Sequence, residues 1–137
     1  MTISTKGRYA LRFMIDVASN GRDSLVTLRE ISQRQGISVK YLEQIAALLS
    51  KAGLIQAVRG NGGGYALTRK VSEYTAGEII HAAEGRIAPV ECLKKEPNEC
   101  PRAEQCPVLK FWNGLDKVVN LYMEQFTLES FLGRNNN

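Results

Sequence analysis

Two helix-like segments separated by a single glycine, Gly36, constrain the fold of this chain most strongly. The first, "TLREISQRQG", opens with Thr27, which can cap a helix, and carries Glu30 three residues later, as in a capping box. The second, "SVKYLEQIAALLSKAG", opens with the capping residue Ser38 and stops at Gly53. A short helix, a tight glycine turn and a longer helix predict a helix-turn-helix unit.

The segment that follows, "LIQAVRGNGGGYALT", predicts a β-hairpin with a glycine-rich tip. Its two short runs, 54–59 and 65–68, flank the sequence "GNGGG". A glycine run can also cradle a phosphate, but this one lacks the Lys-Ser/Thr ending of a P-loop and the strand-then-helix context of a dinucleotide fold. We therefore predict a winged helix-turn-helix, mainly α with a small β-hairpin wing.

Two further helices complete the predicted domain, residues 1–84. Apolar residues recur every three or four positions over 6–19, and the "NG" at 20–21 ends that pattern. The segment "TAGEIIHAAE" at 75–84 predicts a short helix that Gly85 stops. With 137 residues, of which 44% are hydrophobic, the chain can bury a core in one such domain.

Apolar residues at coiled-coil spacing follow Pro107, which is well placed at the start of a helix. These residues are Val108, Trp112, Leu115, Val119, Tyr122 and Phe126. Such a helix can pack on its own domain, but that domain is complete without it. A protein that binds a two-fold symmetric DNA site also needs a segment that forms the dimer. We therefore predict a long C-terminal dimerisation helix, with a tail, over 107–137, and a homodimer.

Positive charge is concentrated in the first half of the chain. Residues 1–70 hold 11 Lys/Arg and 4 Asp/Glu, whereas residues 71–137 hold 7 and 10. This imbalance favours a polyanion, most often nucleic acid, as the partner of the N-terminal half; an ordinary solvated basic face is the alternative. No apolar run is long enough to span a membrane and no secretory signal is present, so we expect a cytoplasmic protein with no membrane partner.

The helix that begins after Ser38 has one apolar face and one polar face. The predicted DNA-reading face consists of Lys40, Glu43, Gln44, Ala47 and Lys51. Glutamine can bond an adenine edge, glutamate can accept from the cytosine amino group, and lysine contacts phosphate or guanine. Glu43 is either a specificity residue or a solvated helix charge. Ser38 and Tyr41, in the same first turn, join this set of candidate contacts.

Two other segments carry candidate contacts to double-stranded operator DNA. Arg59 and Gly60 lie where the glycine tip of the hairpin begins, so the arginine can enter a minor groove or bind a phosphate. Lys6, Arg8 and Tyr9 start the first helix, where both the side chains and the helix N-terminus can meet phosphate. None of these residues is expected to be catalytic.

Three cysteines lie in the predicted loop 85–106. Cys92 and Cys100 are separated by seven residues, and Cys100 and Cys106 by five. Because thiols stay reduced in the cytoplasm, an odd set of three indicates a metal, cluster or redox site rather than a disulfide framework. Thiolates are the soft ligands that iron-sulfur clusters require.

Four segments resemble one family of bacterial regulators. "STKGRYALRFMIDVA", "ISQRQGISVKYLEQI", "GLIQAVRGNGGGYAL" and "TAGEIIHAAEG" are similar to the winged-helix transcription regulators typified by IscR, with NsrR, RirA and CymR as relatives. The similarity spans about residues 3–130. With the three loop cysteines, which CymR-like relatives lack, it points to the iron-sulfur-sensing branch.

This resemblance implies a dimeric regulator, not an enzyme, that binds operator DNA and holds a cluster. The positions that match the family's recognition helix, wing and ligands are Lys40, Tyr41, Glu43, Gln44, Arg59, Cys92, Cys100 and Cys106. The chain departs from the IscR pattern, because the first cysteine gap there is five residues and a histidine ligand stands where this chain has Leu109. The acidic ligand of NsrR-like members corresponds to Arg8.

The fourth ligand and the cluster type, 2Fe-2S or 4Fe-4S, therefore stay open. Glu99, Glu104, another carboxylate, a partner-chain residue, a small thiol or water are candidates for the ligand. We interpret His81 as a packed or surface helix residue.

Other chemistries for the cysteine loop also stay open. Zinc is a rival, although it usually uses a closely spaced cysteine pair. A metal-free thiol switch is another, because Lys94, Lys95 and Arg102 lie nearby in the sequence. A redox or electron-transfer protein has no need of a recognition helix and wing.

Overall fold

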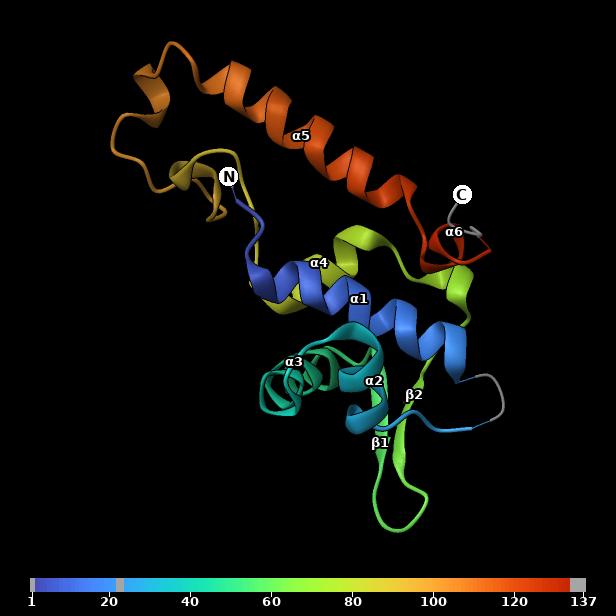
Figure 1. Ribbon diagram of the computed structural model, residues 1–137. Coiled ribbons are helices and arrows are strands. Elements are labelled where there is room, and N and C mark those ends of the chain that lie inside the picture. The colour runs from blue at the N-terminus through green and yellow to red at the C-terminus, as the bar shows by residue number, and fades with distance from the viewer. Residues whose placement is uncertain (1, 22–23, 134–137) are drawn as a thin grey trace.

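The computed structural model describes residues 2–21 and 24–133 of the chain (Figure 1). The described part is mainly helical, with a two-stranded antiparallel hairpin. Its elements are α1 (Thr5–Asn20), α2 (Leu28–Gln35), α3 (Val39–Lys51), β1 (Ile55–Val58), β2 (Gly64–Leu67), α4 (Ala76–Glu84), α5 (Leu109–Gln125) and α6 (Leu128–Phe131). Short 3-10 turns occur at Val71–Glu73, Glu91–Leu93 and Ala103–Gln105.

The helix-turn-helix forms from the local signals that predicted it. The amide of Thr27 donates to Glu30 Oε1 at 2.8 Å, and the amide of Glu30 donates to Thr27 Oγ1 at 3.1 Å, so the capping box of α2 is complete. Gly36 has φ +69°, a left-handed conformation that favours glycine, and it turns the chain toward α3. Ser38 Oγ accepts from the amide of Tyr41 at 3.1 Å and caps α3.

A single main core lies between α1, α3, α4 and the base of the hairpin. Its largest fully buried side chains include Tyr74, Phe13, Met14, Ile31, Leu42, Ile45, Leu49, Leu54, Ile79 and Leu128. The last of these comes from α6, so the C-terminal end of the chain returns to the N-terminal domain. The predicted boundary at residue 84 therefore divides the sequence, but not the core.

The hairpin is the wing of the fold. β1 and β2 pair in antiparallel register from Ile55↔Leu67 to Val58↔Gly64. Tyr65 also exchanges two backbone hydrogen bonds with Val26, of 2.8 and 3.0 Å, which fixes the base of the wing to the segment before α2. Figure 1 shows the wing projecting away from the helices, on the side of the molecule where α2 and α3 lie.

The long helix α5 begins later than predicted. Its first residue is Leu109 and its cap position is Val108, so Pro107 precedes the helix instead of opening it. The chain first closes a turn, in which the amide of Leu109 donates to the carbonyl of Cys106 at 3.5 Å, and this turn occupies the predicted start.

The far end of α5 is fastened to the start of α4. The amide of Ala76 donates to the carbonyl of Phe126 at 2.8 Å, and the amide of Leu128 donates to the carbonyl of Tyr74 at 2.9 Å. Between this point and the cysteine loop, α5 runs along the outside of the molecule (Figure 1).

Candidate nucleic-acid interface and cysteine loop

The two faces of α3 are divided as the sequence predicted. Its buried residues are Leu42, Ile45, Ala46 and Leu49. The five residues of the predicted reading face, Lys40, Glu43, Gln44, Ala47 and Lys51, are all exposed. Their spacing around the helix therefore places a mixed set of donors, acceptors and charges on one accessible surface.

A pair of tyrosines joins the start of α1 to this surface. The rings of Tyr9 and Tyr41 meet edge to face, with centroids 5.6 Å apart and an interplanar angle of 76°. The guanidinium of Arg12 lies 5.2 Å from the centroid of the Tyr9 ring. Lys6 and Arg8 are exposed on the same turn of α1, so the predicted contacts of α1 and α3 lie on neighbouring elements.

The N-terminus of α1 is not open to a phosphate, contrary to the sequence prediction. The amides of Ser4 and Gly7 both donate to Oε2 of Glu84, the last residue of α4, at 3.2 Å in the case of Gly7. A carboxylate already occupies the position that a phosphate would take. Only the side chains of this turn, such as Lys6 and Arg8, remain available for DNA.

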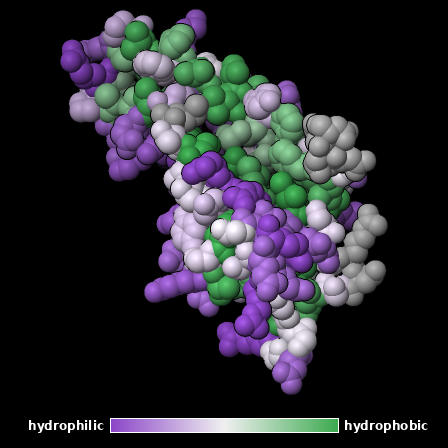
Figure 2. All heavy atoms as spheres, in the orientation of Figure 1, coloured by the Kyte–Doolittle hydropathy of each residue, from purple (hydrophilic) through white to green (hydrophobic). Residues whose placement is uncertain are grey.

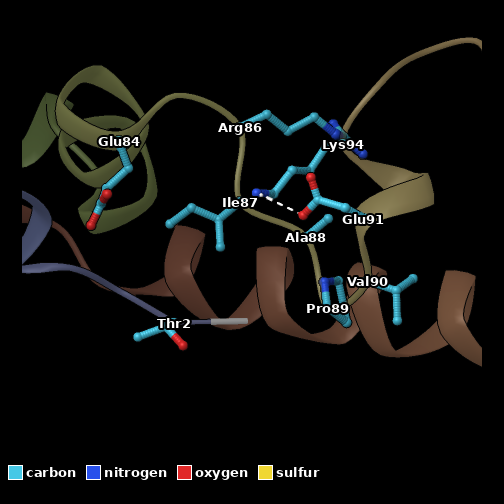
Figure 3. A pocket seen from close by; sticks show the side chains of 9 residues that line it. All are labelled: Thr2, Glu84, Arg86, Ile87, Ala88, Pro89, Val90, Glu91 and Lys94. Atoms are coloured by element: carbon cyan, nitrogen blue, oxygen red, sulfur yellow. Dashed lines mark ion pairs between the residues drawn. The ribbon is translucent and has the colours of Figure 1, made fainter.

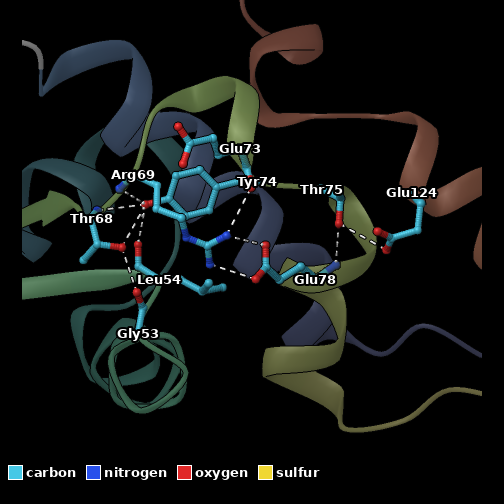
Figure 4. Close-up of polar contacts among 9 residues, drawn as sticks. All are labelled: Gly53, Leu54, Thr68, Arg69, Glu73, Tyr74, Thr75, Glu78 and Glu124. Atoms are coloured by element: carbon cyan, nitrogen blue, oxygen red, sulfur yellow. Dashed lines mark hydrogen bonds and ion pairs between the residues drawn. The ribbon is translucent and has the colours of Figure 1, made fainter.

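The tip of the wing is accessible and its base is fixed. Arg59 and Gly60 are exposed, and Gly60 has φ +99°. Below them, the fully buried Tyr74 accepts hydrogen bonds at its hydroxyl from the amides of Thr68 (2.8 Å) and Arg69 (3.0 Å). The same hydroxyl donates to the carbonyl of Leu54 at 2.8 Å (Figure 4). Tyr74 thus fixes both ends of the hairpin.

Arg69 reinforces this junction. Its guanidinium binds both carboxylate oxygens of Glu78, at 2.7 and 3.0 Å, and lies 4.7 Å from the centroid of the Tyr74 ring (Figure 4). The hydrogen bond to Glu78 raises the pKa of Arg69 above its ordinary value. Sequence reasoning missed Arg69 and Tyr74, and counted the arginine only as positive charge.

A second internal ion pair joins α1 to α2. Asp16 is 2% exposed, and Arg34 binds both of its carboxylate oxygens at 2.8–3.2 Å. The hydrogen bond to Asp16 raises the pKa of Arg34. Gln35 also donates to Asp16, at 3.0 Å, and Arg12 donates to Gln35. Part of the basic charge of residues 1–70 therefore serves the fold, whereas cations such as Lys40, Lys51 and Arg59 are exposed on α3 and the wing.

The three cysteines lie in a loop of short turns between α4 and α5. Cys92, Cys100 and Cys106 are half-buried free thiols. Within residues 2–21 and 24–133, no three His, Cys, Asp or Glu side chains are placed to hold a metal ion together. The donor chemistry suits an iron-sulfur cluster, but this conformation does not bring the donors together.

Charged residues of the loop form ion pairs with each other. Lys94 binds Glu91 at 3.1 Å, and Lys95 binds Glu99 at 3.2 Å. Of the carboxylates named as candidate ligands, Glu99 is thus engaged by a lysine and Glu104 is exposed. His81 lies on α4 with its Nε2 buried and without a hydrogen-bond partner in the described part of the chain.

The apolar surface of α5 is broader than the predicted seam. Trp112, Val119 and Phe126 of that seam are half-buried. The exposed apolar side chains are Val108, Phe111, Leu115, Val118, Leu121 and Tyr122, with Phe111 64% and Val118 63% exposed. Figure 2 shows hydrophobic residues gathered along the edge of the molecule where α5 lies. In the described part of the chain no helix is both long and apolar enough to cross a bilayer.

Comparison with known proteins identifies the family. Residues 3–134 match the family described as "Rrf2: Iron-dependent Transcriptional regulator". The chain belongs to the Rrf2 family. The Rrf2 proteins that it resembles include the HTH-type transcriptional regulator IscR of Photobacterium profundum, 37% identical over 136 residues, which cover 99% of this chain and 78% of that protein.

Two solved structures share the fold. CymR, the global cysteine regulator of B. subtilis, superposes with a TM-score of 0.77 at 36% identity, covering 96% of this chain and 95% of that one. IscR of T. potens superposes with a TM-score of 0.76 at 32% identity, covering 96% and 86%. This Rrf2 protein is therefore a winged-helix, DNA-binding transcription regulator and not an enzyme, as its sequence predicted.

Proposed function

We propose that this Rrf2 protein is a cytoplasmic homodimer that binds a two-fold operator and senses iron-sulfur cluster supply or redox stress through its cysteine loop. The DNA-binding part of this proposal rests on the exposed polar face of α3. This face lies beside the start of α1, in a basic domain that also has a wing. Lys40, Glu43 and Gln44 read base edges in the major groove. Arg59 and Gly60 approach the duplex at the tip of the wing.

The remaining candidate residues hold these groups in place or bind the DNA backbone. Lys6 and Arg8 bind phosphates, because both are exposed cations on the first turn of α1. Tyr9 and Tyr41 keep that turn against α3, and Ser38 caps the reading helix. Both tyrosines are half-buried, so the part of each ring that solvent reaches can contact the same backbone.

The apolar face of α5 supports the dimer. Six large apolar side chains are exposed on this helix and the residue before it, at spacings that give a continuous stripe, and such a stripe is uncommon on a monomer. A second copy packed on this face buries the stripe and sets the distance between the two reading helices, which must match the DNA turn.

The three cysteines support the proposed sensing of clusters or redox stress. Cys92, Cys100 and Cys106 would hold the cluster. When bound, the cluster would supply a group that can be reduced, oxidised or lost. The loop must rearrange to bring the thiols together, so cluster gain or loss changes the loop, and through it the DNA affinity or preference.

A metal-free thiol switch is the second candidate. It is favoured by the three thiols being free and half-buried in a conformation whose described residues do not group them as metal ligands. The CymR structures include one described as the oxidized form of the Staphylococcus aureus protein, so an oxidised state is described for a relative.

Two experiments test the proposal. Selection of binding sites from random duplex DNA, followed by footprinting, should recover a palindromic sequence; recovery of no sequence preference would refute operator recognition. Oxygen-free purification, with iron and sulfide counts and a visible spectrum, tests the cluster. Wild-type protein should take up iron and sulfide, and Cys92→Ser should not.

A different result would support the thiol switch in place of the cluster. In that case the wild-type protein would be colourless, and its DNA affinity would respond to peroxide.

A further inference from the structure

The N-terminus of α1 is closed by a carboxylate from a distant helix. Oε2 of Glu84 accepts from the amides of Ser4 and Gly7, and Gly7 is 77 residues away along the chain. The first turn of α1 has no acidic residue of its own. Apart from Ser4 Oγ, which accepts from the amide of Lys6 at 3.2 Å, the negative end that this helix start requires comes from α4.

Gly7 makes this contact possible. A Cβ atom at this buried position would lie 2.7 Å from Glu84 Oε2 and 2.9 Å from Ile3 Cγ2. Both distances are shorter than real Cβ contacts, so a side chain at residue 7 would displace the carboxylate from this position. Gly7 and Glu84 therefore form a matched pair.

The turn that Glu84 holds is the turn that faces DNA in the proposed complex. Lys6 and Arg8 flank Gly7, and Tyr9 follows with its ring against Tyr41 of α3. The orientation of this turn relative to the reading helix is thus fixed from two sides, by the tyrosine pair and by Glu84. Without the carboxylate, two backbone amides lose their partner and the turn can fray.

Glu84 also stands beside the cysteine loop. Two residues later, Arg86 donates to the carbonyl of Leu93 at 2.9 Å and to Asp116 Oδ2 at 3.2 Å. In Figure 3, Glu84 points toward the N-terminal segment and Arg86 toward the part of the loop that carries Glu91 and Lys94. The short segment 84–86 therefore holds α1 on one side and the cysteine loop and α5 on the other.

We infer that Glu84 is a positioning residue for DNA binding: it fixes the first turn of α1, so that Lys6 and Arg8 meet phosphates. It makes no DNA contact of its own. The inference rests on the proposed function, because it concerns how α1 takes part in that complex. It also makes Glu84 one point at which a rearrangement of the cysteine loop reaches the DNA surface.

The salt dependence of DNA binding tests the inference. The affinity of the wild-type protein for a labelled duplex recovered by selection is measured by fluorescence anisotropy over a series of salt concentrations. The slope of log K against log salt counts the phosphates that the protein neutralises. In Glu84→Ala, and in Glu84→Asp, whose shorter side chain retracts the carboxylate, this slope should fall in magnitude by about 1 to 2.

Two further variants separate positioning from general stability. Glu84→Gln keeps an oxygen that accepts hydrogen bonds, so it should keep the wild-type slope. Glu124 belongs to α5, and its carboxylate lies at the start of α4, where Thr75 Oγ1 donates to it at 3.1 Å. Glu124→Ala therefore removes a matched carboxylate from another helix start and should leave the slope unchanged. A loss of stability alone lowers the fraction of active protein, but not the number of phosphates that each bound molecule contacts.

Each outcome is decisive. Wild-type slopes in both Glu84→Ala and Glu84→Asp would overturn the inference and leave the proposed function intact. A loss in Glu84→Gln as large as that in Glu84→Ala would overturn its basis in hydrogen bonding. Wild-type protein that fails to bind the duplex in a salt-dependent way would instead overturn the proposed function itself.

Discussion

Replacing Tyr74 with phenylalanine tests whether one hydroxyl fastens the wing to the body of the protein. The ring is fully buried and would keep its packing, so the substitution removes only the oxygen. Three backbone groups then lose their partner: the amides of Thr68 and Arg69 and the carbonyl of Leu54. The perturbation is therefore confined to the base of the hairpin.

The structure sets the size of the expected effect. A buried polar group left without a partner costs about 1–3 kcal/mol. Water can reach the exposed Thr68, whereas Leu54 is 1% exposed, so we expect a total loss of about 2–4 kcal/mol in the free energy of unfolding. At roughly 4 °C per kcal/mol for a chain of this length, Tm should fall by about 8–16 °C.

Thermal unfolding followed by circular dichroism measures this loss, with Tyr41→Phe as the control. Tyr41 is half-buried and its ring packs against Tyr9, so the substitution also keeps the ring and removes only a hydroxyl. Its substitution should change the free energy of unfolding by no more than about 0.5 kcal/mol. If Tyr74→Phe unfolds cooperatively at the same Tm as this control, the hydroxyl does not fasten the wing and the reasoning fails.

Four further substitutions test the proposed surfaces. Glu43→Ala should relax discrimination at the base pair it reads by about 1–3 kcal/mol, measured across single-base operator variants. Arg59→Ala should weaken binding to all of these variants in the same titrations. Val118→Glu places a charge in the apolar face of α5 and should shift the protein to monomers in sedimentation analysis. Arg86→Ala should release Leu93 and speed alkylation of Cys92, read by mass spectrometry, whereas an unchanged rate would mean that Arg86 does not hold the loop.

Local signals made the helix-turn-helix predictable. Thr27 and Glu30 lie three residues apart, and Ser38 caps the helix that follows it, so each pattern reports on a contact within one turn. The division of α3 into a buried and an exposed face follows from the helical period alone. Neither prediction required knowledge of which elements pack together.

Contacts between distant residues could not be predicted in this way. In the sequence, Glu84 is an ordinary charged residue at the end of a helix. Only the packing of α4 beside α1 brings its carboxylate to the amides of Ser4 and Gly7. Gly7 was a weak signal, because a glycine in the first turn of a helix carries a cost that a close approach explains. The polar role of Tyr74 likewise depends on chain segments that tertiary packing brings to its hydroxyl.

The surface of α5 shows that one apolar pattern can serve two surfaces. Of the predicted seam, Trp112, Val119 and Phe126 are half-buried, whereas Val108, Leu115 and Tyr122 are exposed. These exposed seam residues form an outer stripe with Phe111 and Val118, and the half-buried ones form an inner stripe. A helix that is apolar over both stripes can pack on its own domain and still present an apolar face, so the two alternatives stated from the sequence are compatible.

The two ends of the cysteine loop limit how a change there can reach DNA. At its start, Arg86 donates hydrogen bonds to the carbonyl of Leu93 and to Asp116. Glu84, two residues earlier, accepts a hydrogen bond from α1. At its end, the loop enters α5, whose far end is fastened by the backbone of Phe126 to the start of α4. A loop that gathers its three thiols into one ligand set must therefore strain or shift one of these two attachments, because both of its ends are held. A shift of α5 changes the spacing of two reading helices in a dimer, and a shift at Glu84 changes the phosphate contacts of each helix α1. Operator spacing variants separate the two routes, since only movement of α5 alters the preferred distance between half-sites.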